Sequence, residues 1–232
     1  MNRNDAPMTA SPDLTGRRVL VTGASSGIGE ATVRALIARG AKVAMLARRA
    51  ERLDALRSQL GDRAYGIPCD VTDLDSLHAG VDAGAHALGG LDTVITVAGR
   101  GMVGTIATGD PAGWRELLDV NLIGPLATVR YAVPHFCADG RRDVVLIGST
   151  GAITPTACVG VYGASKRGLR AAFDSLRLDG DAVSRDCLDK CFIVVSVGRR
   201  RQRKCHDHCD GQRHEAAAYG LHLVGQSAIP RM

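Results

Sequence analysis

Short apolar segments alternate with segments of helical periodicity along most of this 232-residue chain. The apolar, β-branched run 17–22 is followed by residues 27–39, in which apolar side chains recur at helical spacing. A second apolar run at 42–47 precedes an expected helix at 50–60. The alternation continues to about Leu178. It predicts an α/β fold, a doubly wound parallel sheet in a single domain with right-handed crossovers and helices on both faces.

The pattern changes after about residue 178. Residues 191–197 are apolar and β-branched enough for a sixth strand, and residues 221–225 for a stub of a last strand. Between them, residues 199–214 have no apolar periodicity and cannot pack as a core element. The C-terminal edge of the sheet is therefore expected to be incomplete. The predicted division is a flexible segment 1–14, a domain 15–197 and a Cys/His-containing tail 198–232.

The basic charge of the chain is concentrated in this tail. Residues 198–214 contain six Arg or Lys and two Asp, a net charge of +4 out of +5 for the whole chain. Because the composition changes where the strand–helix pattern stops, we favour a frameshifted or otherwise altered reading frame, which would leave an aberrant or disordered segment. The alternatives are a solvated tail, a zinc site made by Cys187, Cys191 and Cys205–Cys209, and nucleic-acid contact through Arg199–Lys204. Nucleic acid is the weaker expectation, because no aromatic residue is interleaved with the arginines.

A glycine-rich turn, Thr22–Gly29, lies between the first expected strand and the first expected helix. In a dinucleotide site Gly23 permits the tight turn, Gly27 lets the backbone approach a pyrophosphate, and Gly29 allows close packing of helix on strand. The helix N-terminus then offers unpaired N–H groups to the phosphates. The alternative is a turn with no ligand.

The end of the second expected strand indicates which dinucleotide is bound. An NAD site usually has Asp or Glu here to hold the ribose 2′-hydroxyl, but this chain has Ala47 followed by Arg48 and Arg49. A guanidinium can hold a 2′-phosphate through charge-assisted hydrogen bonds, which favours NADP(H) over NAD(H). Arg48 is the preferred candidate because it is nearer the strand end. The alternative is two solvated charges at the start of helix 50–60.

Tyr162 and Lys166 stand four residues apart and share one face of an expected helix. A free tyrosine, with a pKa of about 10, is a poor acid or base at neutral pH, whereas a neighbouring ammonium stabilises the phenolate. Ser149 lies upstream at the end of an apolar run. The set indicates acid–base chemistry on a carbonyl or an alcohol; the alternative is an amphipathic pair on a helix surface.

In combination these motifs resemble the short-chain dehydrogenase/reductase family, from about residue 17 to residue 178. The turn Cys69–Thr72 is similar to the family's adenine-contacting turn, and twelve residues separate Ser149 from Tyr162, as in the family. Residues 91–99 resemble its fourth strand, which ends in Asn-Asn-Ala-Gly in the family. In this chain Thr96 and Val97 replace the two asparagines. The Thr96 hydroxyl is expected to take over a structural hydrogen bond. Val197-Gly198 replaces the family's Pro-Gly, so the substrate loop that follows it there is not recognisable here.

The resemblance implies a Rossmann-like NAD(P)-binding domain and a role for each matching residue. Tyr162 would deliver or remove the proton, and Lys166 would stabilise the phenolate and hold the nicotinamide ribose. Ser149 would hydrogen-bond the substrate oxygen, and Asn121 would support a proton relay through water to Lys166. The implied cofactor contacts are Gly23, Ser25, Ser26, Gly27, Ile28, Gly29, Arg48, Arg49, Asp70, Val71, Ala98, Gly99, Tyr162 and Lys166.

The expected function is that of an NADP(H)-dependent oxidoreductase that interconverts a small-molecule carbonyl and an alcohol by hydride transfer. The alternative is a catalytically impaired remnant that binds nucleotide only.

Partners and location are expected from the same pattern. The family commonly forms dimers or tetramers through helices corresponding here to about 111–137 and 162–178. Their apolar residues, expected to be surplus to the core, are Leu117, Leu118, Leu126, Val129, Leu169 and Phe173. There is no run of eighteen apolar residues and no signal peptide pattern, so we expect a cytoplasmic protein with reduced cysteines and no membrane partner.

Overall fold

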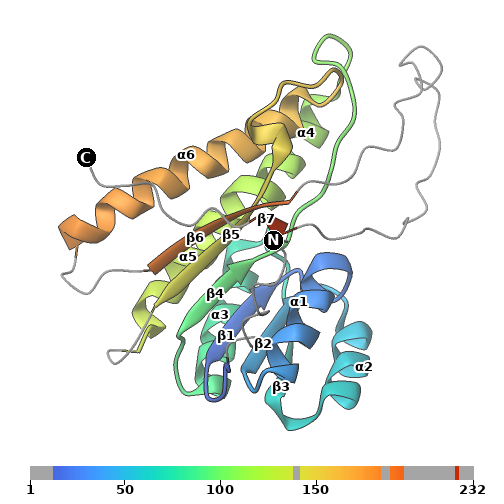
Figure 1. Ribbon diagram of the computed structural model, residues 1–232. Coiled ribbons are helices and arrows are strands. Elements are labelled where there is room, and N and C mark those ends of the chain that lie inside the picture. The colour runs from blue at the N-terminus through green and yellow to red at the C-terminus, as the bar shows by residue number, and fades with distance from the viewer. Residues whose placement is uncertain (1–12, 138–141, 184–188, 196–222, 225–232) are drawn as a thin grey trace, which may run out of the picture.

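A seven-stranded sheet forms the centre of the computed structural model, which describes residues 13–137, 142–183, 189–195 and 223–224 (Figure 1). The strands are β1 (Arg18–Thr22), β2 (Lys42–Ala47), β3 (Ala64–Pro68), β4 (Thr93–Thr96), β5 (Asp143–Ser149), β6 (Asp189–Val195) and β7 (Leu223–Val224). Their order is β3-β2-β1-β4-β5-β6-β7. All neighbouring strands are parallel except β6 and β7. This order confirms the predicted doubly wound, Rossmann-like sheet.

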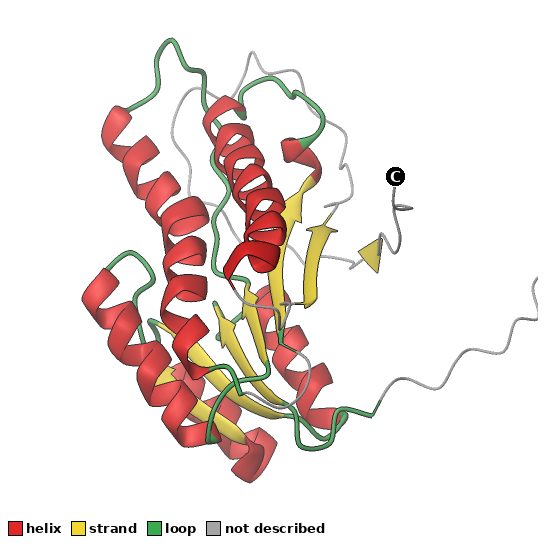
Figure 2. Ribbon diagram, turned by 90° about the vertical axis from the view of Figure 1, so that its left-hand side faces the viewer, coloured by secondary structure: helices red, strands yellow, loops and turns green. Residues whose placement is uncertain are grey.

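Helices cover both faces of this sheet (Figure 2). The longer helices are α1 (Gly27–Ala38), α2 (Ala50–Leu60), α3 (Leu74–Leu88), α4 (Pro111–Leu118), α5 (Gly124–Ala132) and α6 (Gly160–Val183). Because side chains alternate along a strand, Val19 and Val21 of β1 pack in the cluster with α1 and α2, whereas Leu20 packs with α3. Val144 and Leu146 of β5 pack with α5 and α6 in a third cluster. The layers hold the carboxyl ends of β1, β2, β4 and β5 at one edge, where the site lies.

The predicted limits are those of β2 and α2, and they differ by one residue from those of β1 and α1. The agreement is poorer further along the chain. The sixth strand begins two residues earlier than expected and ends at Val195. The expected helix 111–137 is divided, because a π-helical turn, η2 (Asp119–Ile123), separates α4 from α5. The stub expected at 221–225 is the two-residue strand β7. Residues 1–12 of the expected flexible segment 1–14 lie outside the described residues, as do residues 198–222 and 225–232 of the expected tail 198–232. The nucleic-acid alternative and the zinc alternative, apart from Cys191 in β6, fall in the same undescribed part.

Candidate active site

A cleft of about 580 Å³ lies at the carboxyl edge of the sheet. Its walls come from the glycine turn, the ends of β2, β4 and β5, the turn after β3, and the first turns of α6. Ligands of open α/β sheets bind at this edge. All the cofactor contacts implied by the sequence line the cleft: Gly23, Ser25, Ser26, Gly27, Ile28, Gly29, Arg48, Arg49, Asp70, Val71, Ala98, Gly99, Tyr162 and Lys166.

The glycine turn has no room for side chains at two of its three glycines. A Cβ atom on Gly29 would lie 2.1 Å from the carbonyl oxygen of Gly23, so α1 packs directly on the backbone of the turn. Gly23 has a φ of 69°, and a Cβ there would lie 2.7 Å from the nitrogen of Ala98. The side chain of Ser26, the residue before α1, accepts no hydrogen bond from the first N–H groups of the helix. These N–H groups therefore face the cleft without a side-chain partner from Ser26. These features suit a bound pyrophosphate.

The two arginines after β2 have different surroundings. Arg49 donates from Nη2 to Ser25 Oγ at 3.0 Å and to Ser26 Oγ at 2.9 Å, which places its guanidinium on the glycine turn. Arg48 is 74% exposed, and its Nη1 lies 3.9 Å from Asp70 Oδ2. Both line the cleft. The structure therefore gives Arg49, rather than the preferred candidate Arg48, the closer contact with the turn.

Tyr162 and Lys166 lie one turn apart on α6, and both line the cleft. The ring of Tyr162 and the hydroxyl of Ser149 both lie close to Gly151, where a Cβ atom would lie 3.3 Å from Tyr162 Cε1 and 3.5 Å from Ser149 Oγ. Ser149 Oγ accepts a hydrogen bond from the N–H of Gly151 at 3.1 Å. A hydroxyl accepts and donates at once, so this bond leaves the Ser149 proton available to an oxygen of a substrate.

The amine of Lys166 is buried, with the residue only 6% exposed. Its Nζ donates to the carbonyl oxygen of Ile147 at 3.0 Å. Burial lowers the pKa of Lys166 to about 8, because desolvation disfavours the charged ammonium. A Cβ atom on Gly99 would lie 3.5 Å from Nζ, an ordinary contact distance, so the backbone after β4 passes close to the amine.

Asn121 lies in the π-helical turn and is fully buried. Its Oδ1 accepts the N–H of Arg100 at 2.8 Å, and its Nδ2 donates to the carbonyl oxygen of Arg100 at 2.9 Å and to Ser165 Oγ at 3.2 Å. The side chain therefore fastens the loop after β4 to α6. Neither Asn121 nor Ser149 is among the residues that line the cleft.

The hydroxyl of Thr96 makes no hydrogen bond within the described part of the chain, although the residue is 2% exposed. The expectation that this hydroxyl replaces a structural hydrogen bond was wrong. Its neighbours on β1, β4 and β5 use their backbone groups in the parallel ladder, and no other polar atom reaches it.

Replacing Thr96 with valine is expected to raise the free energy of unfolding by about 1–2 kcal/mol, because the change removes a buried hydroxyl without a partner and keeps the shape of the side chain. Urea unfolding measures the change. Thr128→Val is the matched control: Thr128 is equally buried, but its Oγ1 donates to the carbonyl oxygen of Gly124 at 2.7 Å. The free energy of unfolding of the control variant should fall by about 1 kcal/mol, because its hydrogen bond is lost. A loss of stability in Thr96→Val would contradict the prediction.

Two charged residues of the cleft wall were not anticipated from the sequence. Arg100 follows Gly99 directly, and its Nη1 lies 2.5 Å from Oε1 of Glu116 on α4. The position of Arg100, immediately after Gly99, a predicted cofactor contact, was the available signal. Its pairing with Glu116 depends on the packing of α4, which the sequence alone does not show.

No helix within the described ranges is long and apolar enough to cross a membrane. Among the same residues, no cluster of three or more His, Cys, Asp or Glu side chains is arranged to hold a metal ion.

Comparison with known proteins shows the family of this chain. The family model described as short chain dehydrogenase matches residues 17–184. A glycine betaine reductase of Emericella nidulans is 36% identical over 76% of this chain, and a dehydrogenase/reductase SDR family member 7B of Danio rerio is 31% identical over 74%. The matches span only 14% and 59% of those two proteins' own lengths.

Solved structures of similar proteins have the same fold. A short chain dehydrogenase from Burkholderia cenocepacia, solved in complex with NADP, is 32% identical and superposes with a TM-score of 0.68. The similarity covers 74% of this chain and 71% of that one.

Proposed function

Because this chain belongs to the short-chain dehydrogenase family, we propose that it is an NADP(H)-dependent oxidoreductase that interconverts a carbonyl and an alcohol. The observation that carries the proposal is the placement of Tyr162 and Ser149 close to Gly151, with Tyr162 and Lys166 lining a cleft that also includes the glycine turn. When bound, the cofactor would supply or accept the hydride. In reduction the phenol of Tyr162 gives its proton to the substrate oxygen, and in oxidation the phenolate removes it.

Each neighbouring group has a distinct part in this proton chemistry. Ser149 donates a hydrogen bond to the substrate oxygen and holds it beside Tyr162. Lys166, in its ammonium form, stabilises the phenolate of Tyr162. The side chain of Asn121 is already hydrogen-bonded to Arg100 and Ser165. We therefore propose that the water that relays protons to Lys166 is held by the backbone of the π-helical turn, where the regular helical hydrogen-bond pattern is interrupted.

The cleft suits a dinucleotide phosphate in particular. The turn at Gly23 and Gly29 leaves space that a Cβ atom would fill, and the start of α1 has no side-chain cap. Within the described part of the chain, four cationic residues line the cleft, Arg48, Arg49, Arg100 and Lys166, against two carboxylates, Asp70 and Glu116. This excess of positive charge favours a ligand with several phosphates. Arg49, held against both serines of the turn, is our candidate for the 2′-phosphate.

Arg49→Ala is expected to weaken NADPH binding about 10- to 100-fold, because charge-assisted hydrogen bonds to a phosphate are lost. NADH binding should change by less than about twofold, since NADH has no 2′-phosphate. Fluorescence titration of both cofactors measures the two effects. Arg52→Ala on the exposed side of α2 is the matched control for loss of a nearby charge. An equal loss for NADH would mean that Arg49 only supports the turn.

Oxidation of NADPH in the presence of aldehydes, ketones and quinones tests the proposed activity. Turnover identifies an enzyme. Tight NADPH binding without turnover of any carbonyl would instead identify a chain that binds nucleotide only.

We also propose a homodimer or homotetramer, although the expected interface needs correction. Four of the six apolar residues expected to be surplus belong to the chain's own core: Leu117, Val129, Leu169 and Phe173. Leu118 and Leu126 are partly exposed, and Ile123, between α4 and α5, is 43% exposed. An interface along α4 and α5 would therefore be centred on these three side chains.

Light scattering is expected to report a dimer or a tetramer at micromolar concentration, and Ile123→Glu to shift the protein toward the monomer. Arg130→Glu, an exposed change on the same helix pair, controls for added negative charge. A well-folded wild-type monomer would contradict the proposal.

A further inference from the structure

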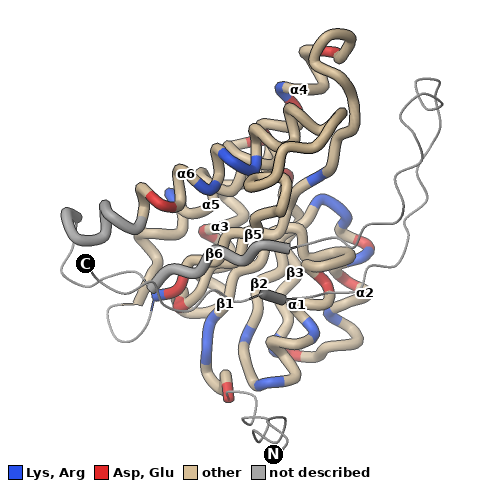
Figure 3. The backbone as a smooth tube through the Cα atoms, turned by 45° about the horizontal axis from the view of Figure 1, so that its top comes forward, with Lys and Arg blue, Asp and Glu red and all other residues tan. Residues whose placement is uncertain are grey.

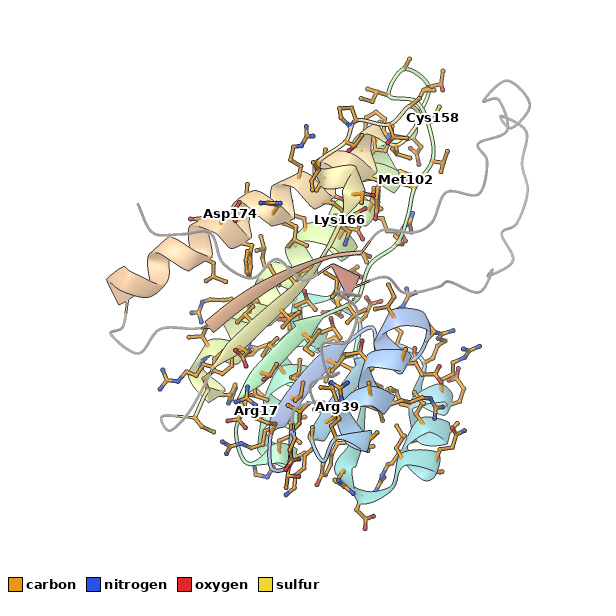
Figure 4. All side chains as sticks on the ribbon, in the orientation of Figure 1. Arg17, Arg39, Met102, Cys158, Lys166 and Asp174 are labelled. Atoms are coloured by element: carbon orange, nitrogen blue, oxygen red, sulfur yellow. The ribbon has the colours of Figure 1, made fainter. Side chains whose placement is uncertain are left out.

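Two loops rise from the catalytic edge of the sheet on either side of Tyr162. One follows β4 and the other follows β5, and they are joined where the N–H of Gly104 donates to the carbonyl oxygen of Cys158 at 2.7 Å. A parallel bridge between Gly104 and Val159 continues this contact. In the view of Figure 4, Met102 lies between Lys166 and Cys158. The joined loops thus extend beyond the cleft from its catalytic end, and of their residues Gly101 lines the cleft itself.

These two loops are uncharged. Neither residues 101–109 nor residues 150–159 contain Asp, Glu, Lys, Arg or His, although 23% of the whole chain is charged. Both loops are therefore tan throughout in Figure 3. The polar residues that they do contain are threonines, whose hydroxyls largely bond within the loops, as between Thr105 and Thr108.

The loops also carry exposed apolar side chains. Val103 is 78% exposed, Ile106 67% and Ile153 55%, the three highest values for large apolar residues in the described part of the chain. Ile106 reaches the start of the catalytic helix: a Cβ atom on Gly160, two residues before Tyr162, would lie 3.1 Å from Ile106 Cδ1. Apolar surface of this kind, next to a reactive group, marks a place where an apolar ligand is covered.

The cations that lie beside these loops in the described part of the chain, Arg100 and Arg167, are both engaged by other groups. Arg167 on α6 donates from Nε to the carbonyl oxygen of Ala152 at 3.0 Å and from Nη2 to that of Ile153 at 3.2 Å. Arg100 lies where the loop after β4 begins, and its guanidinium pairs with Glu116. Its backbone is held on both sides by Asn121, so its Cα position is fixed. A carboxylate or phosphate on the substrate would have to displace Glu116 to reach Arg100, or the loop carbonyls to reach Arg167. The two loops themselves contain no cation.

We propose that the substrate is an uncharged carbonyl compound or alcohol with extended apolar groups, which Val103, Ile106 and Ile153 cover. This inference rests on the proposed oxidoreductase function and names the substrate class of that site. Each methylene added to an apolar substrate should improve KM about fourfold until the loops are filled.

A matched pair of substrates tests the inference: a linear methyl ketone ending in a methyl ester, and the same ketone ending in a free carboxylate. With NADPH, kcat/KM is expected to be at least about tenfold higher for the ester. Ile106→Glu should raise KM for the ester about tenfold or more and reduce the preference. Val133→Glu, an exposed apolar residue near the opposite edge of the sheet, is the control and should change neither value. Equal or better turnover of the carboxylate overturns the inference and leaves the proposed function standing.

Calorimetry on the NADPH-loaded chain separates the two proposals if neither ketone is turned over. Absence of NADPH oxidation would then refute the proposed activity, while tighter binding of the ester than of the carboxylate would still support the inference, and equal binding would overturn it. The inference also fails if Ile106→Glu changes the oligomeric state without changing the ester preference. The loops would then be covered by a second copy of the chain.

Discussion

Replacing Tyr162 with phenylalanine is expected to lower kcat for NADPH-dependent carbonyl reduction about 10²- to 10⁴-fold, the usual contribution of a positioned proton donor. The ring would still pack over Gly151, so the change removes only the hydroxyl that transfers the proton. NADPH affinity should stay within about threefold of the wild type, because one hydrogen bond to the cofactor is the most that is lost. Stopped-flow or steady-state measurement of NADPH oxidation, with a fluorescence titration alongside, separates the two effects.

Tyr65→Phe on β3 is the matched control, since Tyr65 packs against the core on the far side of the glycine turn from α6. The control should keep its kcat. If Tyr162→Phe kept more than about a tenth of the wild-type kcat, another group would have to supply the proton.

The second large effect concerns Lys166, for which we expect activity and stability to change in opposite directions. Lys166→Met should abolish turnover, because the cation that stabilises the phenolate is lost. At neutral pH it should also raise the free energy of unfolding by about 2 kcal/mol. Burial holds the pKa of Lys166 at about 8, against the ordinary value of 10.5 for a lysine, so the folded protein disfavours the charged amine. That difference corresponds to about 3 kcal/mol, from which about 1 kcal/mol is subtracted for the lost hydrogen bond to Ile147.

The sign of the pH dependence follows from the lowered pKa. Below pH 8 the amine is charged in both states, and the full cost of burying the charge is present. As the pH rises from about 8 to about 10.5, the folded state releases its proton first, and wild-type stability gains relative to Lys166→Met. Urea unfolding of both proteins near neutral pH and near pH 10 measures the difference in their free energies of unfolding, which should shrink at the higher pH. Lys42→Met, at an exposed lysine that begins β2, should show neither effect. A Lys166→Met protein less stable than the wild type at neutral pH would disprove the account.

The elements that could be predicted are those set by local pattern. The limits of β2 and α2 follow from an apolar run and a polar-faced helix, and the glycine turn follows from its spacing. The break at Asp119–Ile123 was missed because its apolar residues continue the helical period of α4. A π turn inserts one residue without changing that composition.

The site was harder to predict wherever packing decides the outcome. Arg48 was preferred for its closeness to the strand end, but successive side chains diverge there, and Arg49 is the one that turns toward the serines. The apolar stripe of α6 is the same in sequence whether it meets the chain's own core or a second copy, so Leu169 and Phe173 were assigned to the wrong surface. The pairing of Arg100 with Glu116 joins two elements whose relative placement no local pattern contains.

The direct contact of Gly29 with the backbone of Gly23 has a consequence for how this chain can evolve. A side chain at position 29 is excluded by the fold itself, whether or not a nucleotide is bound. Selection for a stable fold alone would therefore retain this glycine in a descendant that had lost its chemistry. Lys166 differs from Gly29 in this respect, because burying its amine lowers the stability of the fold. Neutral drift would therefore replace this lysine once turnover was no longer under selection. The surviving lysine is thus a better record of recent enzymatic selection than the whole glycine motif.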